Sequence, residues 1–79
     1  MGTKNNPGDF DCYANAEPDE PMFILLGRDP NAPSIVEAWA DIRERDGEDA
    51  TKVQEARDCA NNMRTWLRKL GKEERPLAY

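Results

Sequence analysis

The sequence contains no histidine, only two cysteines and no long apolar run. Without histidine, acid–base catalysis near neutral pH would need carboxylates whose pKa is raised by burial, and a chain of 79 residues offers little buried volume for that. A zinc site needs four Cys or His ligands at close spacing, but Cys12 and Cys59 lie far apart. A transmembrane helix needs about 20 apolar residues, and the most apolar run here is only Met22 to Leu26. The sequence therefore predicts a protein that is not an enzyme, carries no metal or other cofactor and does not enter a membrane.

The charge balance is acidic, with 16 Asp and Glu against 11 Lys and Arg and a net charge of −5. Such a chain repels the phosphate backbone, so we expect no direct DNA binding. It would instead suit docking on the basic surface of a nucleic-acid-binding protein, although solubility alone favours the same composition. The polar N-terminus gives no signal-peptide pattern, which predicts a cytoplasmic protein with two buried free thiols. A disulfide between Cys12 and Cys59 is the alternative.

The second half of the chain reads as two helices. Pro33 suits a first helical turn and Gly47 suits a helix end, which predicts a helix over residues 32–46. A second helix is expected over residues 49–70, because its apolar residues recur every three or four positions. The connection between them is only a few residues long, so the two helices should pack as an antiparallel hairpin.

The first half reads as extended. Residues 9–16 alternate roughly between apolar and polar, which indicates a short strand, and residues 22–26 are a second strand or an irregular segment. The predicted fold class is therefore α+β, mostly α, with an extended segment or short β-hairpin over residues 9–27 packed on the helical hairpin. Residues 1–8 are expected to be a disordered tail and residues 72–79 a flexible one, on either side of one small domain over residues 9–71.

The expected core joins the two helices to the segment before them. At 1.5 Å per residue, the second helix should be roughly 31 Å long and the first roughly 20 Å, so the end of the second helix overhangs. Residues 22–26 are best placed to cover this overhang; otherwise the overhang, or one face of the segment, is an interface with a second copy or a target. The predicted core residues are Phe23, Leu25, Ile35, Trp39, Ile42, Val53, Ala56, Ala60, Met63 and Leu67.

Two groups of charged or aromatic side chains are candidate binding residues. Glu37, Asp41 and Glu44 on the first helix would form an acidic rim that docks on a basic groove. A second group would hold a small anionic ligand, and it consists of Arg28, Arg64, Trp66 and Arg68. Both groups also fit ordinary solvated helix faces.

The stretch DCYANAEPDEPMFILLGRDPNAP, followed by VEAWA, resembles a family of small phage and prophage proteins of uncharacterised function. The likeness covers residues 9–45 and extends to the second helix only in pattern. It implies an accessory gene product that works in the bacterial cytoplasm during infection. Small, acidic, non-enzymatic phage proteins resemble inhibitors of host machinery, including anti-CRISPR and other anti-defence proteins.

Three functions follow as hypotheses. The first is a viral anti-defence or host-takeover inhibitor that binds a host protein. The second is a homo-oligomeric sponge that sequesters a nucleotide immune signal. The third is a structural component of the virion or of its assembly.

Overall fold

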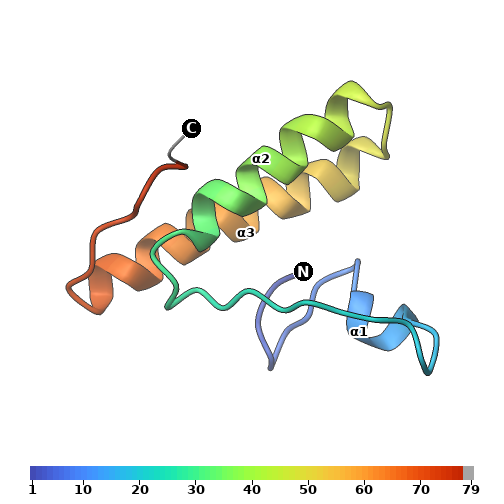
Figure 1. The fold of residues 1–79 in the computed structure, drawn as a ribbon, viewed down its shortest axis with the longest axis horizontal. Helices are drawn as coiled ribbons and strands as arrows, with labels where there is room; N and C mark the ends of the chain where they lie inside the picture. Colours follow the sequence, from blue (N-terminus) through green and yellow to red (C-terminus); the bar gives the residue numbers. More distant parts are fainter. Residues whose placement is uncertain (78–79) are drawn as a thin grey trace.

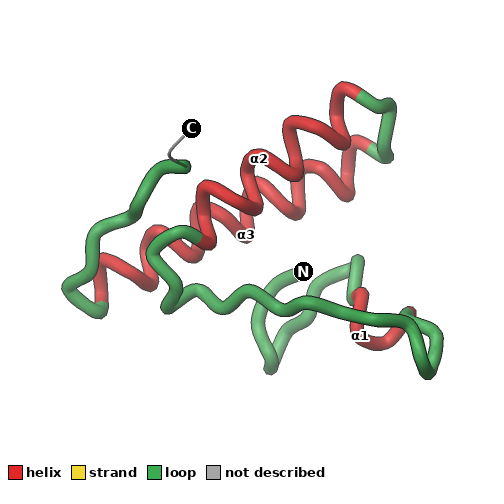
Figure 2. The backbone as a smooth tube through the Cα atoms, in the orientation of Figure 1, coloured by secondary structure: helices red, strands yellow, loops and turns green. Residues whose placement is uncertain are grey.

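The computed structural model describes residues 1–77, in which the regular structure consists of three helices. They are α1 (Cys12–Asn15), α2 (Ala32–Arg45) and α3 (Ala50–Lys69), and Figures 1 and 2 show that turns and irregular segments connect them. Neither expected strand is present in this part of the chain, so the α+β prediction is wrong and the described fold is all-helical. Residues 78–79, the end of the predicted flexible tail, lie outside the described residues.

The first expected strand is replaced by the short helix α1. The Asp11 carboxylate accepts hydrogen bonds from the backbone N–H groups of Tyr13 (3.1 Å) and Ala14 (3.3 Å), an N-terminal cap that offsets the weak strand pattern. Residues 9–16 are therefore unavailable as a partner strand, and residues 22–26 pair with no strand within residues 1–77. A two-stranded hairpin is marginal in water even when both strands are present.

The helical hairpin is present as expected, with bounds that shift by one residue. Pro33 lies in the first turn of α2, where its missing N–H costs nothing, and Gly47 follows the helix with a φ of 83°, which favours glycine. Asp49 caps α3 through the Thr51 N–H (2.9 Å). Figure 1 shows α2 and α3 lying side by side with the loop at one end.

The interface between the two helices is built from small side chains. Ala40, Ala56 and Ala60 are completely buried, and Val53 and Leu67 are nearly so. Alanine lets two helix backbones approach closely, but it leaves little apolar volume for a core. Cover from outside the hairpin is therefore needed, and Met1 supplies part of it by packing against the cluster around Ala40 and Val53.

Four predicted core residues are not buried. Phe23 is 87% exposed, and Ile35, Trp39 and Ile42 on α2 are each more than a third exposed. The prediction that Trp39 is a core residue is therefore wrong. The reason is that α2 turns its Ala32, Val36 and Ala40 side toward the interior, and an alanine seam has no room for an indole ring. Leu25 and Met63 are partly buried, and the remaining four predicted core residues are buried.

The segment before α2 crosses the end of α3, as the expected cover would. A Cβ placed on Gly27 would lie 3.5 Å from Met63 Cγ and 3.6 Å from Trp66 Cδ1, so the backbone itself rests on these side chains. The cover is partial, because Trp66 and Leu70 remain about half exposed.

Both ends of the described chain contact the hairpin. The Glu55 carboxylate accepts hydrogen bonds from the backbone N–H groups of Asp9 (2.8 Å) and Phe10 (3.1 Å). At the other end, the Arg75 N–H donates to the Pro30 carbonyl (2.8 Å). Residues 1–8 were expected to be a disordered tail, and the segment that directly follows them is held on α3. Residues 72–75 run back toward the start of α2 (Figure 1).

Candidate functional site

The predicted acidic rim on α2 is occupied by arginines of α3. Arg57 donates to Asp41 (2.7 Å) and Glu44 (3.0 Å), and Arg64 forms an ion pair with Glu37 (2.8 Å). These contacts join the two helices, so the three carboxylates are not a free docking surface. Arg57 was missed as a partner, although counting outward from the loop on both helices would have placed it opposite these acids.

Arg64 is also bound within the fold. Besides Glu37, its guanidinium donates to the Glu74 carboxylate (2.8 and 2.9 Å) and to Asn61 Oδ1 (2.8 Å). The Glu37 hydrogen bond is the main cause that raises the pKa of Arg64 above its ordinary value. A guanidinium with these partners fastens the C-terminal segment to the hairpin, so the structure does not present Arg64 as a ligand for an anion.

The loop end of the hairpin holds a third ion-pair group. Arg43 donates to Glu48 (2.7 Å), and the Lys52 ammonium lies 3.8 Å from the same carboxylate. The Arg43 hydrogen bond lowers the pKa of Glu48 below its ordinary value of 4.5. Hydrogen bonds from Thr51, its hydroxyl first, lower the pKa of Asp49.

Both lowered pKa values predict acid sensitivity. A carboxyl whose pKa is lower in the folded than in the unfolded chain adds stability above its unfolded value, and this is lost as pH falls through the folded value. We therefore expect the melting temperature to fall as pH drops below about 4.5, the ordinary value for Glu48. Glu48→Gln should lower the melting temperature at pH 7 by a few degrees, with a smaller difference from the parent at acidic pH.

Circular dichroism melts from pH 7 to pH 3 test this expectation. Glu73→Gln, which changes an exposed carboxylate outside the loop, is the matched control and should follow the parent at every pH. If the difference in melting temperature between Glu48→Gln and the parent did not decrease at acidic pH, the expected role of Glu48 would be contradicted.

The remaining predicted ligands for an anion lie near the end of the hairpin opposite the loop. Arg28 and Arg68 are exposed, and the Lys69 ammonium lies 5.3 Å from the centre of the Trp66 ring. The Lys72 ammonium donates to the Arg28 carbonyl (3.3 Å). The residues that the structure brings to this end thus make it the more basic part of the molecule.

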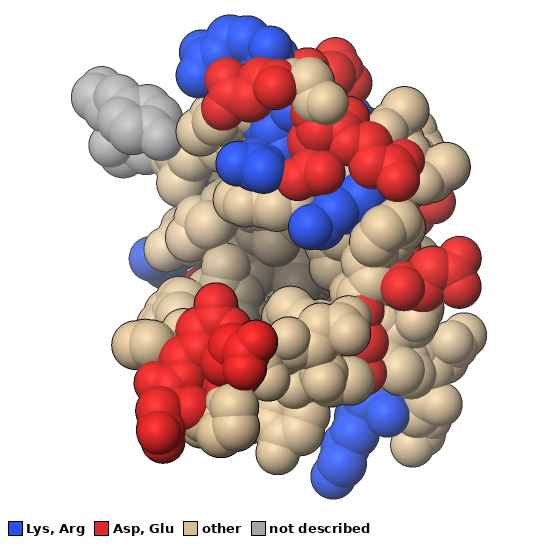
Figure 3. Space-filling model, turned by 90° about the vertical axis from the view of Figure 1, so that its right-hand side faces the viewer, with Lys and Arg blue, Asp and Glu red and all other residues tan. Residues whose placement is uncertain are grey.

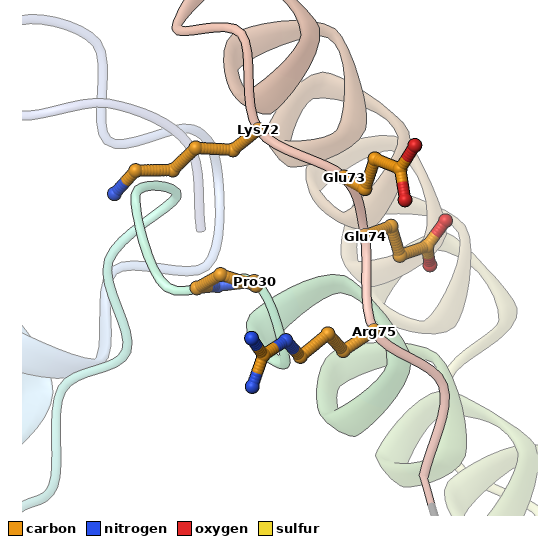
Figure 4. Close-up of a pocket in the computed structure, with 5 residues that line it drawn as sticks. All are labelled: Pro30, Lys72, Glu73, Glu74 and Arg75. Atoms are coloured by element: carbon orange, nitrogen blue, oxygen red, sulfur yellow. The ribbon is translucent and has the colours of Figure 1, made fainter.

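A shallow pocket of about 360 Å³ lies at this end, lined by Pro30 and residues 72–75. Figure 4 shows the Lys72 and Arg75 side chains extending on the Pro30 side, while the Glu73 and Glu74 carboxylates point away. Neither Lys72 nor Arg75 was singled out in the sequence, because isolated basic residues near a chain end carry no pattern.

Residues 22–26, here called the apolar arm, carry the most exposed apolar side chains. Phe23 is 87% exposed and Ile24 is 61% exposed, while Met22 and Leu26 are about half exposed. Among the described residues, the backbone hydrogen bonds on either side join Glu20 to Glu17 and Asp29 to Leu26, and none involves residues 21–25. The sequence showed that residues 22–26 are apolar, but it did not show that their side chains are exposed.

The acids of residues 9–20, here called the acidic segment, are the second feature that the structure leaves open. This segment has five acids and no base, and none of its carboxylates forms an ion pair within residues 1–77. Figure 3 looks at the end of the molecule where α1 and the hairpin loop lie. It shows a mixed group of charges at the top, a group of acidic side chains alone below, and a hollow lined by uncharged side chains between them.

The two cysteines are free thiols, and Cys12 is exposed, so the expectation of two buried thiols is wrong for Cys12. Burial raises the pKa of the Cys59 thiol above its ordinary value, which makes it a poor nucleophile. Within residues 1–77, no group of three or more Cys, Asp or Glu side chains is arranged to hold a metal ion, and no helix is long and apolar enough to cross a bilayer.

No protein-family model, no curated protein and no solved structure matches this chain.

Proposed function

We propose that this protein acts by binding another protein, as a non-enzymatic inhibitor of a host protein in the manner of phage anti-defence or host-takeover factors. The exposed apolar surface is the observation that carries the proposal. The described residues leave nine large apolar side chains at least 38% exposed in the apolar arm, on α2 and at the end of α3, and Tyr13 in α1 is 73% exposed. Exposed apolar side chains that gather on a protein surface mark interaction sites.

The charge distribution favours a partner with a basic surface. The α2 acids are paired with Arg57 and Arg64 of α3, so the acidic segment replaces them as the part that would meet a basic surface. Figure 3 shows acidic side chains below an uncharged hollow at the end of the molecule that carries α1, and this hollow offers a place for a protruding part of the partner. A host protein that normally holds nucleic acid has the basic surface that such a segment would cover.

A charge-matched pair of variants tests the proposal. The double variant Glu17→Gln with Asp19→Asn removes two charges from the acidic segment at side chains that make no hydrogen bond through their carboxylates within residues 1–77. Asp58→Asn with Glu73→Gln removes the same charge from exposed positions elsewhere. We expect the first pair to weaken binding to the captured host protein several-fold, as the loss of two exposed charge pairs would. The second pair lies outside the acidic segment and should leave the affinity within about twofold of the parent.

The measurement is affinity purification from infected host cells, followed by titration of the purified partner at 50 and 300 mM salt. The complex should weaken with salt, since exposed charges are screened. Equal effects of the two double variants, or an affinity that does not respond to salt, would contradict the role of the acidic segment. Recovery of the chain in purified virus particles would favour the structural function instead.

The pocket beside Lys72 and Arg75 favours a nucleotide-binding sponge as the second candidate. Lys72 and Arg75 at its edge form no ion pair within residues 1–77, and two such cations would suit a phosphate group. Ligand binding to the folded state raises the melting temperature by mass action. A nucleotide that raised it in the parent, but not in a Lys72→Ala, Arg75→Ala variant, would favour this function over the first.

A further inference from the structure

The apolar arm has the properties of an unpaired edge strand. It runs nearly straight between α1 and α2 (Figure 2), and no described hydrogen bond uses the backbone of residues 21–25. Its phenylalanine and isoleucine are strand-forming residues. A row of free N–H and C=O groups beside exposed apolar side chains is a template for pairing with another chain.

The sequence of the arm is complementary to itself in an antiparallel arrangement. With Ile24 opposite Ile24 of a second copy, Met22 lies opposite Leu26 and Phe23 opposite Leu25, so every arm position meets an apolar side chain. The same arrangement brings Glu20, just before one end of the arm, close to Arg28, just past the other end. Two-fold symmetry makes this contact twice.

The backbone chemistry agrees with that register. In an antiparallel pair, alternate residues exchange N–H···O=C bonds with the partner. If the Ile24 pair is one that exchanges them, Met22 and Leu26 form the next such pair, and Pro21 falls where no donor is required. The Leu26 carbonyl, which accepts from the Asp29 N–H (3.0 Å), would then accept a second hydrogen bond. The Arg28 side chain makes no hydrogen bond or ion pair with residues 1–77 and is exposed, so it is available to a second molecule.

The exposed apolar area of the arm is also large enough to form part of an interface. Large apolar side chains carry about 150–250 Å² each, so the four exposed ones of the arm present roughly 500 Å². A standard interface buries about 800 Å² on each partner. The arm presents more than half of that as exposed apolar surface, and pairing along its edge buries the part that lies next to the partner strand.

We propose that the apolar arm pairs antiparallel with the arm of a second copy, centred on Ile24, with the Glu20 side chain of each copy against Arg28 of the other. The resulting dimer presents two acidic segments, so it could engage a repeated or two-sided basic surface with avidity. This inference goes beyond the proposed host-protein binding and has its own test, because it concerns the isolated chain.

Charge exchange at the two ends of the arm provides that test. Glu20→Arg places arginines together at both ends of the dimer, and Arg28→Glu places glutamates together. Each variant should dimerise about tenfold more weakly than the parent, since two attractive pairs become repulsive. The double variant restores opposite charges and should return to within about threefold of the parent.

A mixture of the two single variants gives the sharpest result. One chain then carries two arginines and the other two glutamates, so both ends of the mixed dimer are attractive. We expect heterodimers at least tenfold tighter than either homodimer in sedimentation equilibrium at chain concentrations from about 1 μM to 1 mM. Glu20 accepts a hydrogen bond from the Glu17 N–H (2.9 Å), so Glu20→Gln, which retains that contact, and circular dichroism of every variant control for the local turn.

A parent that stays monomeric throughout this range, or a mixture without heterodimers, overturns the inference. If the isolated chain is monomeric but Phe23→Ala, a change within the arm and outside the acidic segment, weakens capture of the host protein, the arm is occupied by the host protein instead. In that case the proposed function stands and the dimer does not. If the dimer behaves as described and no host protein is captured, the dimer stands and the proposed function does not.

Discussion

Replacing Leu67 by alanine is expected to lower the free energy of unfolding by about 2–5 kcal/mol, the range found for buried Leu→Ala substitutions. Leu67 is 1% exposed and is the largest fully buried side chain of the described residues. Its buried companions on α3 are a valine and two alanines, which have little volume with which to close the cavity. A single core of this size supplies about 3–5 kcal/mol in total, so the substitution should leave the chain largely unfolded at 37 °C.

Urea denaturation followed by circular dichroism at 222 nm measures this loss. Leu70→Ala is the matched control, since Leu70 lies one turn further along, caps the same helix and is 47% exposed. We expect its effect to stay below about 1 kcal/mol, as for other substitutions of exposed side chains. Similar losses at the two positions would mean that the end of α3 is not packed as described.

The helical hairpin was predictable because its signals are local. Pro33 at the start of α2, Gly47 after its end and Asp49 before α3 each act through their own backbone geometry or a neighbouring N–H group. Such signals do not depend on distant residues. The helix bounds therefore differ from the expected ones by a single residue.

The packing of α2 could not be predicted in the same way. Its pattern shows one broad apolar side, and both Trp39 and Ala40 belong to it. Which of the two meets α3 depends on how closely the helices approach, and that distance is set jointly by alanines on both of them. The largest apolar residue was taken as the core residue, whereas the close approach buries the smallest.

The prediction of two strands was wrong for a related reason. Alternation over residues 9–16 is too short to compete with a single capping carboxylate, Asp11. A strand also needs a partner, and its partner depends on the rest of the chain. The apolar arm thus keeps the composition of a strand without pairing inside the described fold.

Part of the candidate site could be predicted from the sequence. The acidic balance and the apolar run Met22 to Leu26 could be read directly, but ion pairing could not. The Arg57 contacts to Asp41 and Glu44 convert an apparent docking rim into a link between helices. The same long-range pairing leaves the acidic segment, rather than α2, as the surface open to a partner.

Replacing Ala56 by leucine is the second change with a large expected effect. Ala56 has no exposed surface and lies in the cluster with Ala40 and Val53. The added methyl groups cannot fit between two backbones held at alanine spacing, so α2 and α3 must separate or Met1 must be displaced. We expect a loss of about 1–3 kcal/mol, which is a large share of the stability of such a small domain.

The location of the disturbance separates this prediction from a general loss of helix. Hydrogen exchange should show faster opening of residues 1–10, which are held on α3 beside the cluster, together with the centre of the hairpin. Ala50→Leu is the control, because Ala50 is exposed at the first position of α3 and should change the unfolding free energy by less than about 0.5 kcal/mol. If Ala56→Leu were as stable as this control, the alanine seam would have to be wider than the buried surface indicates. Since the narrow seam is also what excludes Trp39 from the core, the same result would remove the physical reason for an exposed apolar side on α2.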